Sequence, residues 1–283
     1  MSEFEMWMRM QSRREATIVY YRAYIQWTFR NGRIKWDEFW NKEAVQKCFE
    51  NIWKLDIKNS TRKKYLMSMR IFSDFLISKW FIDVNYSREC LQSPKVQKAL
   101  PFAMDRDCFT QVYNAIYRRW WDGMLGRRNK MIFDTLIYTG LRREELTKLL
   151  RSDVDKDKIS VRDGKWGKKR NIFLPEHFSI ELQAYITETA WESDYLFFSD
   201  RIRGNKLGVG AISTTFKRIS LSAWMRVYPH LLRHTYASNC IIDGVDIYTV
   251  QQQLGHSDVA TTSIYLYLND NMRMKNIQKL QYA

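Results

Sequence analysis

The clearest apolar pattern in the first part of the chain predicts a helix over residues 61–80. Its apolar residues recur three and four positions apart and so share one helical face: Leu66, Met69, Phe72 and Leu76. Ser60 precedes the pattern and is expected as the N-cap. Residues 13–29 show a second helical pattern rich in aromatic and aliphatic side chains, which we expect to form a core.

The periodicity changes in the second half of the chain. Residues 127–138 and 143–150 have helical patterns, whereas residues 158–162 alternate and residues 171–175 resume an extended run. Glycines lie between the two extended runs, which predicts an antiparallel β-hairpin. Its tip is basic, with Lys165, Lys168, Lys169 and Arg170. Helical patterns return from about residue 211 to the end.

Glycine and proline divide the chain. Gly32 is the only glycine before Gly123, and no proline precedes Pro94, which favours a helical N-terminal part. Pro94 and Pro101 enclose a short stretch of small and charged residues that is typical of an extended connector. We therefore predict a helical domain over 1–92, a linker over 93–104 and a second domain over 105–283. The fold class is mainly α with a small antiparallel β-sheet.

Composition narrows the class of protein. The 283 residues carry a net charge of +15, which favours a polyanionic partner, most often nucleic acid, over a merely basic surface. No apolar run approaches the ~18 residues of a membrane span, so no membrane association is expected. The four cysteines are far apart, which argues against disulfides and fits a reducing cytoplasm: Cys48, Cys90, Cys108 and Cys240. The basic helical faces, with Arg62, Lys63 and Arg70, either contact DNA or are simply solvated.

Three of the four histidines group near the end of the chain. His230 and His234 are four residues apart, the spacing of a helical zinc pair, and His256 follows Gly255. No glutamate follows His230, and no thiol or carboxylate is obviously offered nearby. We therefore expect neither a metal nor a cofactor.

Five motifs in order resemble the tyrosine recombinase, or phage-integrase-type, family. They are the Gly-Leu-Arg-x-x-Glu-Leu box at 140–146, a lysine-bearing hairpin tip at 164–170, His-x-x-Arg at 230–233, Leu-Gly-His at 254–256 and a tyrosine in the segment 261–265. The resemblance implies a mostly helical catalytic domain with a small hairpin. It also implies a helical, SAM-like core-binding domain before it, which the first half fits more loosely.

The resemblance implies a nucleophile and two clamping cations. Arg142 and Arg233 match the family's clamp arginines, whose planar forks suit the nonbridging oxygens of a phosphodiester. Tyr265 matches the nucleophile, which would form a 3′-phosphotyrosyl link and release a 5′-hydroxyl. Tyr267, two residues on, is the rival. Without the family context, Arg142 is better explained as a solvated partner of the following glutamates.

The remaining site residues would support that chemistry. Lys165 matches the general acid for the leaving oxygen, with Lys168 and Lys169 as competitors on the same tip. His230 and His256 would donate hydrogen bonds to the phosphate or shuttle the tyrosine proton. Glu145 would orient its neighbours, and His234 is expected to be structural or to support the site indirectly.

The resemblance therefore implies site-specific recombination of double-stranded DNA. Resolution of chromosome or plasmid dimers, as by Xer proteins, is favoured, and a mobile-element integrase remains open. The alternatives are a type IB-like topoisomerase and a non-catalytic DNA-binding accessory protein. The family also implies a tetramer on two DNA sites, with the C-terminal tail exchanged between protomers, although a tail packed on its own domain fits the same sequence.

Overall fold

The computed structural model describes residues 1–39, 41–96, 102–120, 123–162, 169–189, 192–200, 202, 204–256 and 261–265. It divides into two compact units, Met1–Ala99 and Leu100–Ala283. Within the described ranges, no helix is both long and apolar enough to cross a membrane.

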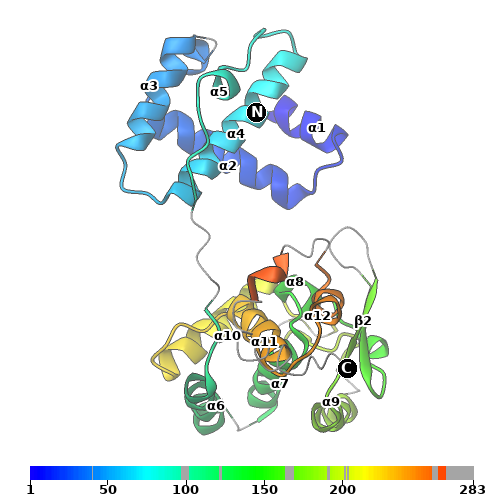
Figure 1. The fold of residues 1–283 in the computed structure, drawn as a ribbon. Helices are drawn as coiled ribbons and strands as arrows, with labels where there is room; N and C mark the ends of the chain where they lie inside the picture. Colours follow the sequence, from blue (N-terminus) through cyan, green and yellow to red (C-terminus); the bar gives the residue numbers. More distant parts are fainter. Residues whose placement is uncertain are drawn as a thin grey trace, which may run out of the picture. The chain divides into compact units, whose positions relative to one another are not determined.

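The first unit is helical. Its elements are α1 (Ser2–Met10), α2 (Glu15–Gly32), η1 (Trp36–Glu38), α3 (Lys42–Trp53), α4 (Asn59–Ser78) and α5 (Tyr86–Glu89). The long helix α2 packs against both α3 and α4 (Figure 1). The predicted apolar stripe of α4 is confirmed, since Leu66, Met69, Phe72 and Leu76 are all buried in this core.

One detail of the predicted α4 is corrected. The helix begins at Asn59, and its N-cap is Lys58, whose backbone is extended, so Ser60 lies inside the first turn. Two arginines off the apolar stripe form hydrogen bonds within the unit. Arg62 donates to the carbonyls of Trp53 and Leu55, and Arg70 Nη2 donates to the Leu91 carbonyl at 2.6 Å.

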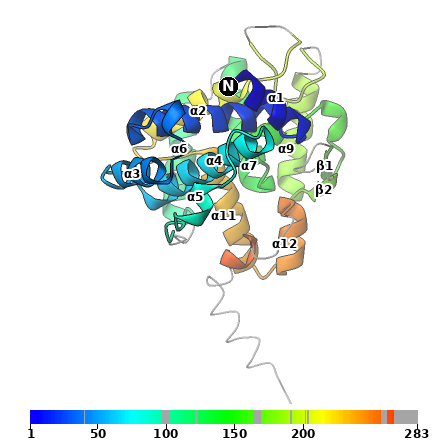
Figure 2. The ribbon, with the colours of Figure 1, turned by 90° about the horizontal axis from the view of Figure 1, so that it is seen from above.

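The second unit has helices around a central pair. Its elements are α6 (Arg106–Trp120), α7 (Gly123–Thr139), α8 (Arg143–Leu146), η2 (Arg151–Asp153), β1 (Lys158–Val161), β2 (Arg170–Phe173), α9 (Glu176–Glu188), α10 (Val209–Ser222), α11 (Pro229–Ile242) and α12 (Ile247–Leu254). Helices α7 and α11 contact each other in the middle, with α6 and α10 on one side and α9 and the strands on the other (Figure 1). Helices α11 and α12 lie side by side (Figure 2).

The predicted hairpin is confirmed. Strands β1 and β2 pair antiparallel, with Lys158 opposite Phe173 and Val161 opposite Arg170. The helix predicted over 143–150 is shorter than expected, because α8 ends at Leu146 and Leu150 instead forms a β-bridge with Tyr195. The helical pattern after residue 211 is also interrupted, since turns separate α10, α11 and α12.

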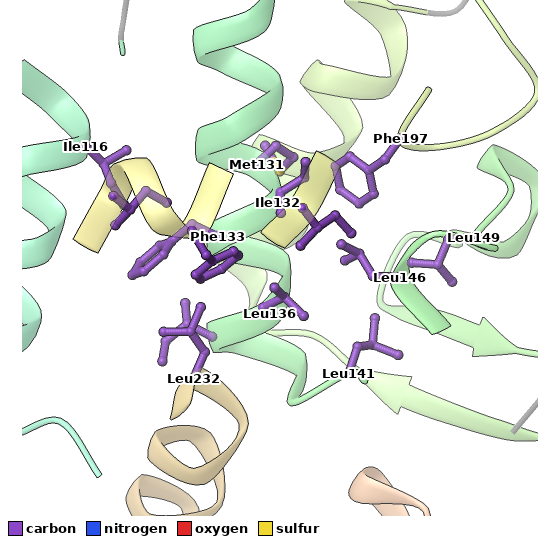
Figure 3. Close-up of a cluster of buried hydrophobic side chains, with 14 of the residues drawn as sticks. Ile116, Met131, Ile132, Phe133, Leu136, Leu141, Leu146, Leu149, Phe197 and Leu232 are labelled. Atoms are coloured by element: carbon purple, nitrogen blue, oxygen red, sulfur yellow. The ribbon is translucent and has the colours of Figure 1, made fainter. Parts of the chain in front are cut away.

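Buried leucines fix the segment between α7 and α8. Leu136 lies near the end of α7, and Leu141, Leu146 and Leu149 point into the same cluster (Figure 3). Leu141 and Leu146 are 0% exposed. Close packing on both sides of residues 142–145 holds this short segment in one conformation, which positions the side chains described next.

Candidate active site

The turn after α7 depends on a glycine. Gly140 has a φ of +60°, in the left-handed region that favours glycine. A Cβ at this position would lie 2.6 Å from Cδ1 of Tyr236 on α11. The Gly140 carbonyl accepts a 2.6 Å hydrogen bond from Arg233 Nη1. Gly140 therefore lets α7 end against α11 and supplies an acceptor for Arg233.

The Glu145 carboxylate holds two arginines. It accepts hydrogen bonds from the Arg142 backbone N–H at 2.9 Å and from Arg142 Nη1 at 3.0 Å. Arg170, the first residue of β2, donates to it from Nη1 at 3.0 Å and from Nη2 at 2.8 Å. Burial opposes ionisation of Glu145, but the hydrogen bonds and charge of Arg170, with those of Arg142, outweigh burial and lower its pKa. Glu145 is therefore ionised and fixes the Arg142 side chain.

The C-terminal end of α12 receives both clamp arginines. Arg233 Nη2 donates to the Leu254 carbonyl at 2.8 Å, and Arg142 Nη2 donates to the Gly255 carbonyl at 3.3 Å. Carbonyls at a helix C-terminus lack helical partners and carry partial negative charge. Burial, followed by the charge of Arg142, lowers the pKa of Arg233 to about 9, so Arg233 stays protonated at neutral pH. Two guanidinium groups thus lie at one turn.

Two further sequence-predicted residues, His230 and His256, lie near these cations. His256 Nδ1 is 2.9 Å from the hydroxyl oxygen of Thr262. Burial, followed by the charges of Arg233 and Arg142, lowers the pKa of His230 and brings that of His256 to about 3. Both imidazoles are therefore neutral at pH 7, and each has one N–H to donate.

Tyr265 packs on the helices that carry the site. It belongs to a buried cluster with Ala237 and Ile241 of α11 and with Val250 and Leu254 of α12. Tyr265 is 2% exposed, and its hydroxyl oxygen is 2.5 Å from His234 Nδ1. The structure therefore brings a phenol, neutral imidazoles and two guanidinium groups to the region between α11, α12 and α8.

This set of groups suits an anionic ester. Guanidinium groups bind phosphate oxygens bidentately, and a phenol is an oxygen nucleophile. In the part of the chain that the structure describes, no three His, Cys, Asp or Glu side chains are grouped as metal ligands.

Some predicted residues fall outside the described ranges. Lys165 and Lys168 of the hairpin tip, the rival Tyr267 and the tail over 266–283 are among them. Lys169, the other competitor on the tip, is described and is exposed.

Comparison with known proteins decides the family. The phage integrase family matches residues 105–272, more than half of the chain. The chain belongs to the phage integrase family. This tyrosine recombinase is an enzyme of site-specific DNA recombination. It is 30% identical over 266 residues to the tyrosine recombinase XerA of Thermococcus kodakarensis, which covers 93% of this chain and 88% of the relative.

Solved structures agree with this membership. A crystal structure of XerA recombinase matches with a TM-score of 0.54 and 26% identity, covering 99% of this chain and 98% of that one. A lambda integrase tetramer bound to a Holliday junction matches the recombinase with a TM-score of 0.75 and 16% identity, covering 93% of this chain and 75% of that one. The second likeness, at low identity, shows the fold.

Sequence reasoning assigned one residue of the recombinase to the wrong environment. Arg170 was expected among the basic residues of the hairpin tip. Instead its side chain is 10% exposed, pairs with Glu145 and donates from Nε to the Gln253 carbonyl at 2.9 Å. Its place in β2 could have signalled this, because alternation along the strand separates it from exposed Lys169 and Asn171.

Proposed function

We propose that Tyr265 is the nucleophile of this recombinase. The observation that carries the proposal is its burial between α11 and α12, the helices that bear Arg233 and lead to His256. The phenol gives its proton to a neutral histidine of the site, His230 or His256, and its oxygen attacks the scissile phosphorus. The 5′-oxygen leaves with a proton from Lys165, so a 3′-phosphotyrosyl bond replaces the phosphodiester. A 5′-hydroxyl of the partner strand then reverses the step, which conserves the bond energy without ATP.

Arg142 and Arg233 neutralise the phosphate in this mechanism. Negative charge on the nonbridging oxygens is greatest in the pentavalent transition state, so fixed cations stabilise that state more than the ground state. Glu145 acts through Arg142, whose guanidinium it holds at 3.0 Å. Its own carboxylate is occupied by the two arginines, so we assign it a positioning role.

The histidines and the hairpin lysine complete the set. If His256 Nδ1 accepts a hydrogen bond from the Thr262 hydroxyl, its Nε2–H is left to donate to a phosphate oxygen. His230 serves the same phosphate. Lys165 protonates the leaving 5′-oxygen, as the family resemblance implies. None of these steps uses a metal or an organic cofactor.

Double-stranded DNA is the proposed partner, gripped by both domains, 1–92 and 105–283, with the linker 93–104 between them. We propose a tetramer on two sites, with the C-terminal tail exchanged between protomers. The lambda integrase tetramer on a Holliday junction supports this assembly. Likeness to XerA favours the resolution of chromosome or plasmid dimers over mobile-element integration as the biological role.

A nicked suicide substrate tests the nucleophile. Wild type, incubated with such a duplex in the absence of added metal and nucleotide, should form a covalent adduct that survives denaturant. Tyr265→Phe should form none, because the attacking oxygen is gone. Tyr267→Phe is the matched control and should retain the adduct. If Tyr265→Phe formed the adduct and Tyr267→Phe did not, the assignment would be wrong. Exchange between two sites, rather than relaxation alone, separates recombination from topoisomerase activity.

A further inference from the structure

His234 is the histidine that contacts the proposed nucleophile. It lies one helical turn after His230 on α11, and its Nδ1 is 2.5 Å from the Tyr265 hydroxyl oxygen. The two ring centroids are 5.8 Å apart. Sequence reasoning gave His234 only a structural or indirect role and gave the proton shuttle to His230 and His256. The structure instead places His234 against the reacting oxygen.

The contacts of the other two histidines lie elsewhere. His256 is directed at Thr262 through Nδ1. His230 meets the His234 ring edge-on, with centroids 4.5 Å apart. His234 therefore contacts both His230 and Tyr265.

The surroundings of His234 favour its neutral form. Burial, followed by the charges of His230 and Arg233, lowers the pKa of His234 to about 4. At neutral pH the ring therefore has one N–H and one acceptor nitrogen. With the ring proton on Nε2, Nδ1 accepts a hydrogen bond from the Tyr265 hydroxyl.

We propose that His234 is the positioning residue of the nucleophile. Its Nδ1 accepts a hydrogen bond from the Tyr265 hydroxyl and so holds the phenol oxygen in one orientation. The inference rests on the proposed role of Tyr265. In-line attack requires the oxygen to be aligned with the phosphorus–oxygen bond that breaks, and small misplacements are costly. A hydroxyl that is already oriented before DNA binds loses less rotational freedom on reaching the transition state.

Two substitutions separate positioning from packing. His234→Leu replaces the imidazole with an apolar side chain of similar size and so removes the acceptor nitrogen. In His234→Asn, the amide oxygen can occupy the place of Nδ1. In single-turnover cleavage at saturating DNA, we expect His234→Leu to be slower than wild type by about 10- to 100-fold, in the range of misplaced reacting groups. We expect His234→Asn to recover most of the rate, and both variants to keep wild-type DNA affinity.

A substrate with a sulfur atom in place of the 5′-bridging oxygen assigns the defect to one end of the reaction. A thiolate leaves without protonation, so Lys165→Ala should be relieved on this substrate. His234→Leu should stay slow, because its fault is on the attacking side. The proposal would be overturned by full activity of His234→Leu, by relief of its defect with sulfur, or by an Asn variant no faster than the Leu variant.

A measurement on the protein alone tests the hydrogen bond without relying on cleavage activity. The ¹⁵N resonances of His234 in the intact protein should show protonation at Nε2 and a hydrogen-bonded Nδ1. Tyr265→Phe should move the Nδ1 resonance to the value of a nitrogen without that bond. An unchanged resonance would overturn the contact itself. If Tyr265→Phe moved the Nδ1 resonance as expected but wild type formed no adduct on either substrate, the assignment of the nucleophile would be refuted and the hydrogen bond would stand.

Discussion

At the scale of single residues, one buried carboxylate organises the site. Glu145 has a side chain 5% exposed and receives Arg142 and Arg170 from different parts of the chain. Arg170 also reaches the Gln253 carbonyl near the end of α12. The same guanidinium therefore joins the base of the hairpin, α8 and α12. The geometry around the arginines proposed to bind the phosphate depends on a residue that would not itself touch it.

Arg170→Gln should be strongly destabilising. Removal of one partner leaves a buried carboxylate undercompensated, which costs about 3–5 kcal/mol. Arg127→Gln is the matched control, since Arg127 pairs with Glu188 at the same 2.8 Å but both side chains are more than half exposed. The control should lose less than about 1 kcal/mol. Urea denaturation of the intact chain measures both, and equal losses would contradict the role given to burial.

The lowered pKa of Glu145 predicts a pH dependence with a definite sign. A carboxyl group whose pKa is lower in the folded state stabilises the fold above its unfolded value and loses this contribution as pH falls through the folded value. The free energy of unfolding of wild type should therefore exceed that of Glu145→Gln most at neutral pH. The gap should narrow below the ordinary glutamate pKa of 4.5. Denaturation curves at several pH values test this, and a gap that widened in acid would refute it.

At the scale of elements, two helix ends hold Arg142 and Arg233 in place. The turn after α7 carries Arg142, and the C-terminus of α12 supplies the carbonyls that hold Arg142 and Arg233. Both ends use a left-handed glycine, Gly140 with φ +60° and Gly255 with φ +65°. At both glycines, neighbouring side chains leave little room for a Cβ: Tyr236 beside Gly140 and Arg170 beside Gly255.

Gly140→Ala separates backbone strain from crowding when it is compared with Gly204→Ala. Both glycines have positive φ, but a Cβ at Gly204 meets nothing within 4 Å, whereas one at Gly140 lies 2.6 Å from the Tyr236 ring. Gly204→Ala should cost about 1–2 kcal/mol from the left-handed conformation alone. Gly140→Ala should cost about 1–3 kcal/mol more, because the crowding adds to the strain.

Cleavage should distinguish the same two variants. The Gly140 carbonyl is the 2.6 Å acceptor of Arg233 Nη1, so a shifted turn also displaces a group that we propose binds the phosphate. Folded Gly140→Ala should therefore cleave the suicide substrate more slowly, and Gly204→Ala should match wild type. Equal cleavage rates would mean that the turn does not set the position of Arg233.

At the scale of the whole molecule, the charge of +15 has two uses. A few arginines are enclosed in the site or bonded to backbone carbonyls, as Arg62 and Arg70 are in the first unit. We expect exposed basic side chains elsewhere to make diffuse contact with the DNA backbone. We expect the logarithm of DNA affinity to fall steeply and linearly with the logarithm of salt concentration, because each neutralised phosphate releases counterions. Titrations of the intact protein at several salt concentrations test this, and a flat response would contradict a backbone grip.

Sequence patterns predicted much of the fold because local periodicity produces it. The α4 stripe and the hairpin are examples, since each arises from residues close together in the chain. The motifs also pointed to candidate site residues, several of which lie near one another in the structure. They could not show the partners of Arg170 or His234, because those contacts join residues 25 and 31 positions apart. Helix starts were less well predicted. At the start of α4 the N-cap is Lys58, whose side chain makes no capping hydrogen bond, so no typical capping residue marks the position.

The enclosure of Tyr265, 2% exposed, has a consequence for the genome that the protein inhabits. A DNA-binding protein spends most of its encounters on sequences that are not its target. A nucleophile that lies open to every phosphodiester would leave nicks along the way. If Tyr265 is the nucleophile, as proposed, its hydroxyl is enclosed and held at His234, so it can attack only a phosphate that is brought to that one position. Most contacts with ordinary DNA would then leave the strand intact.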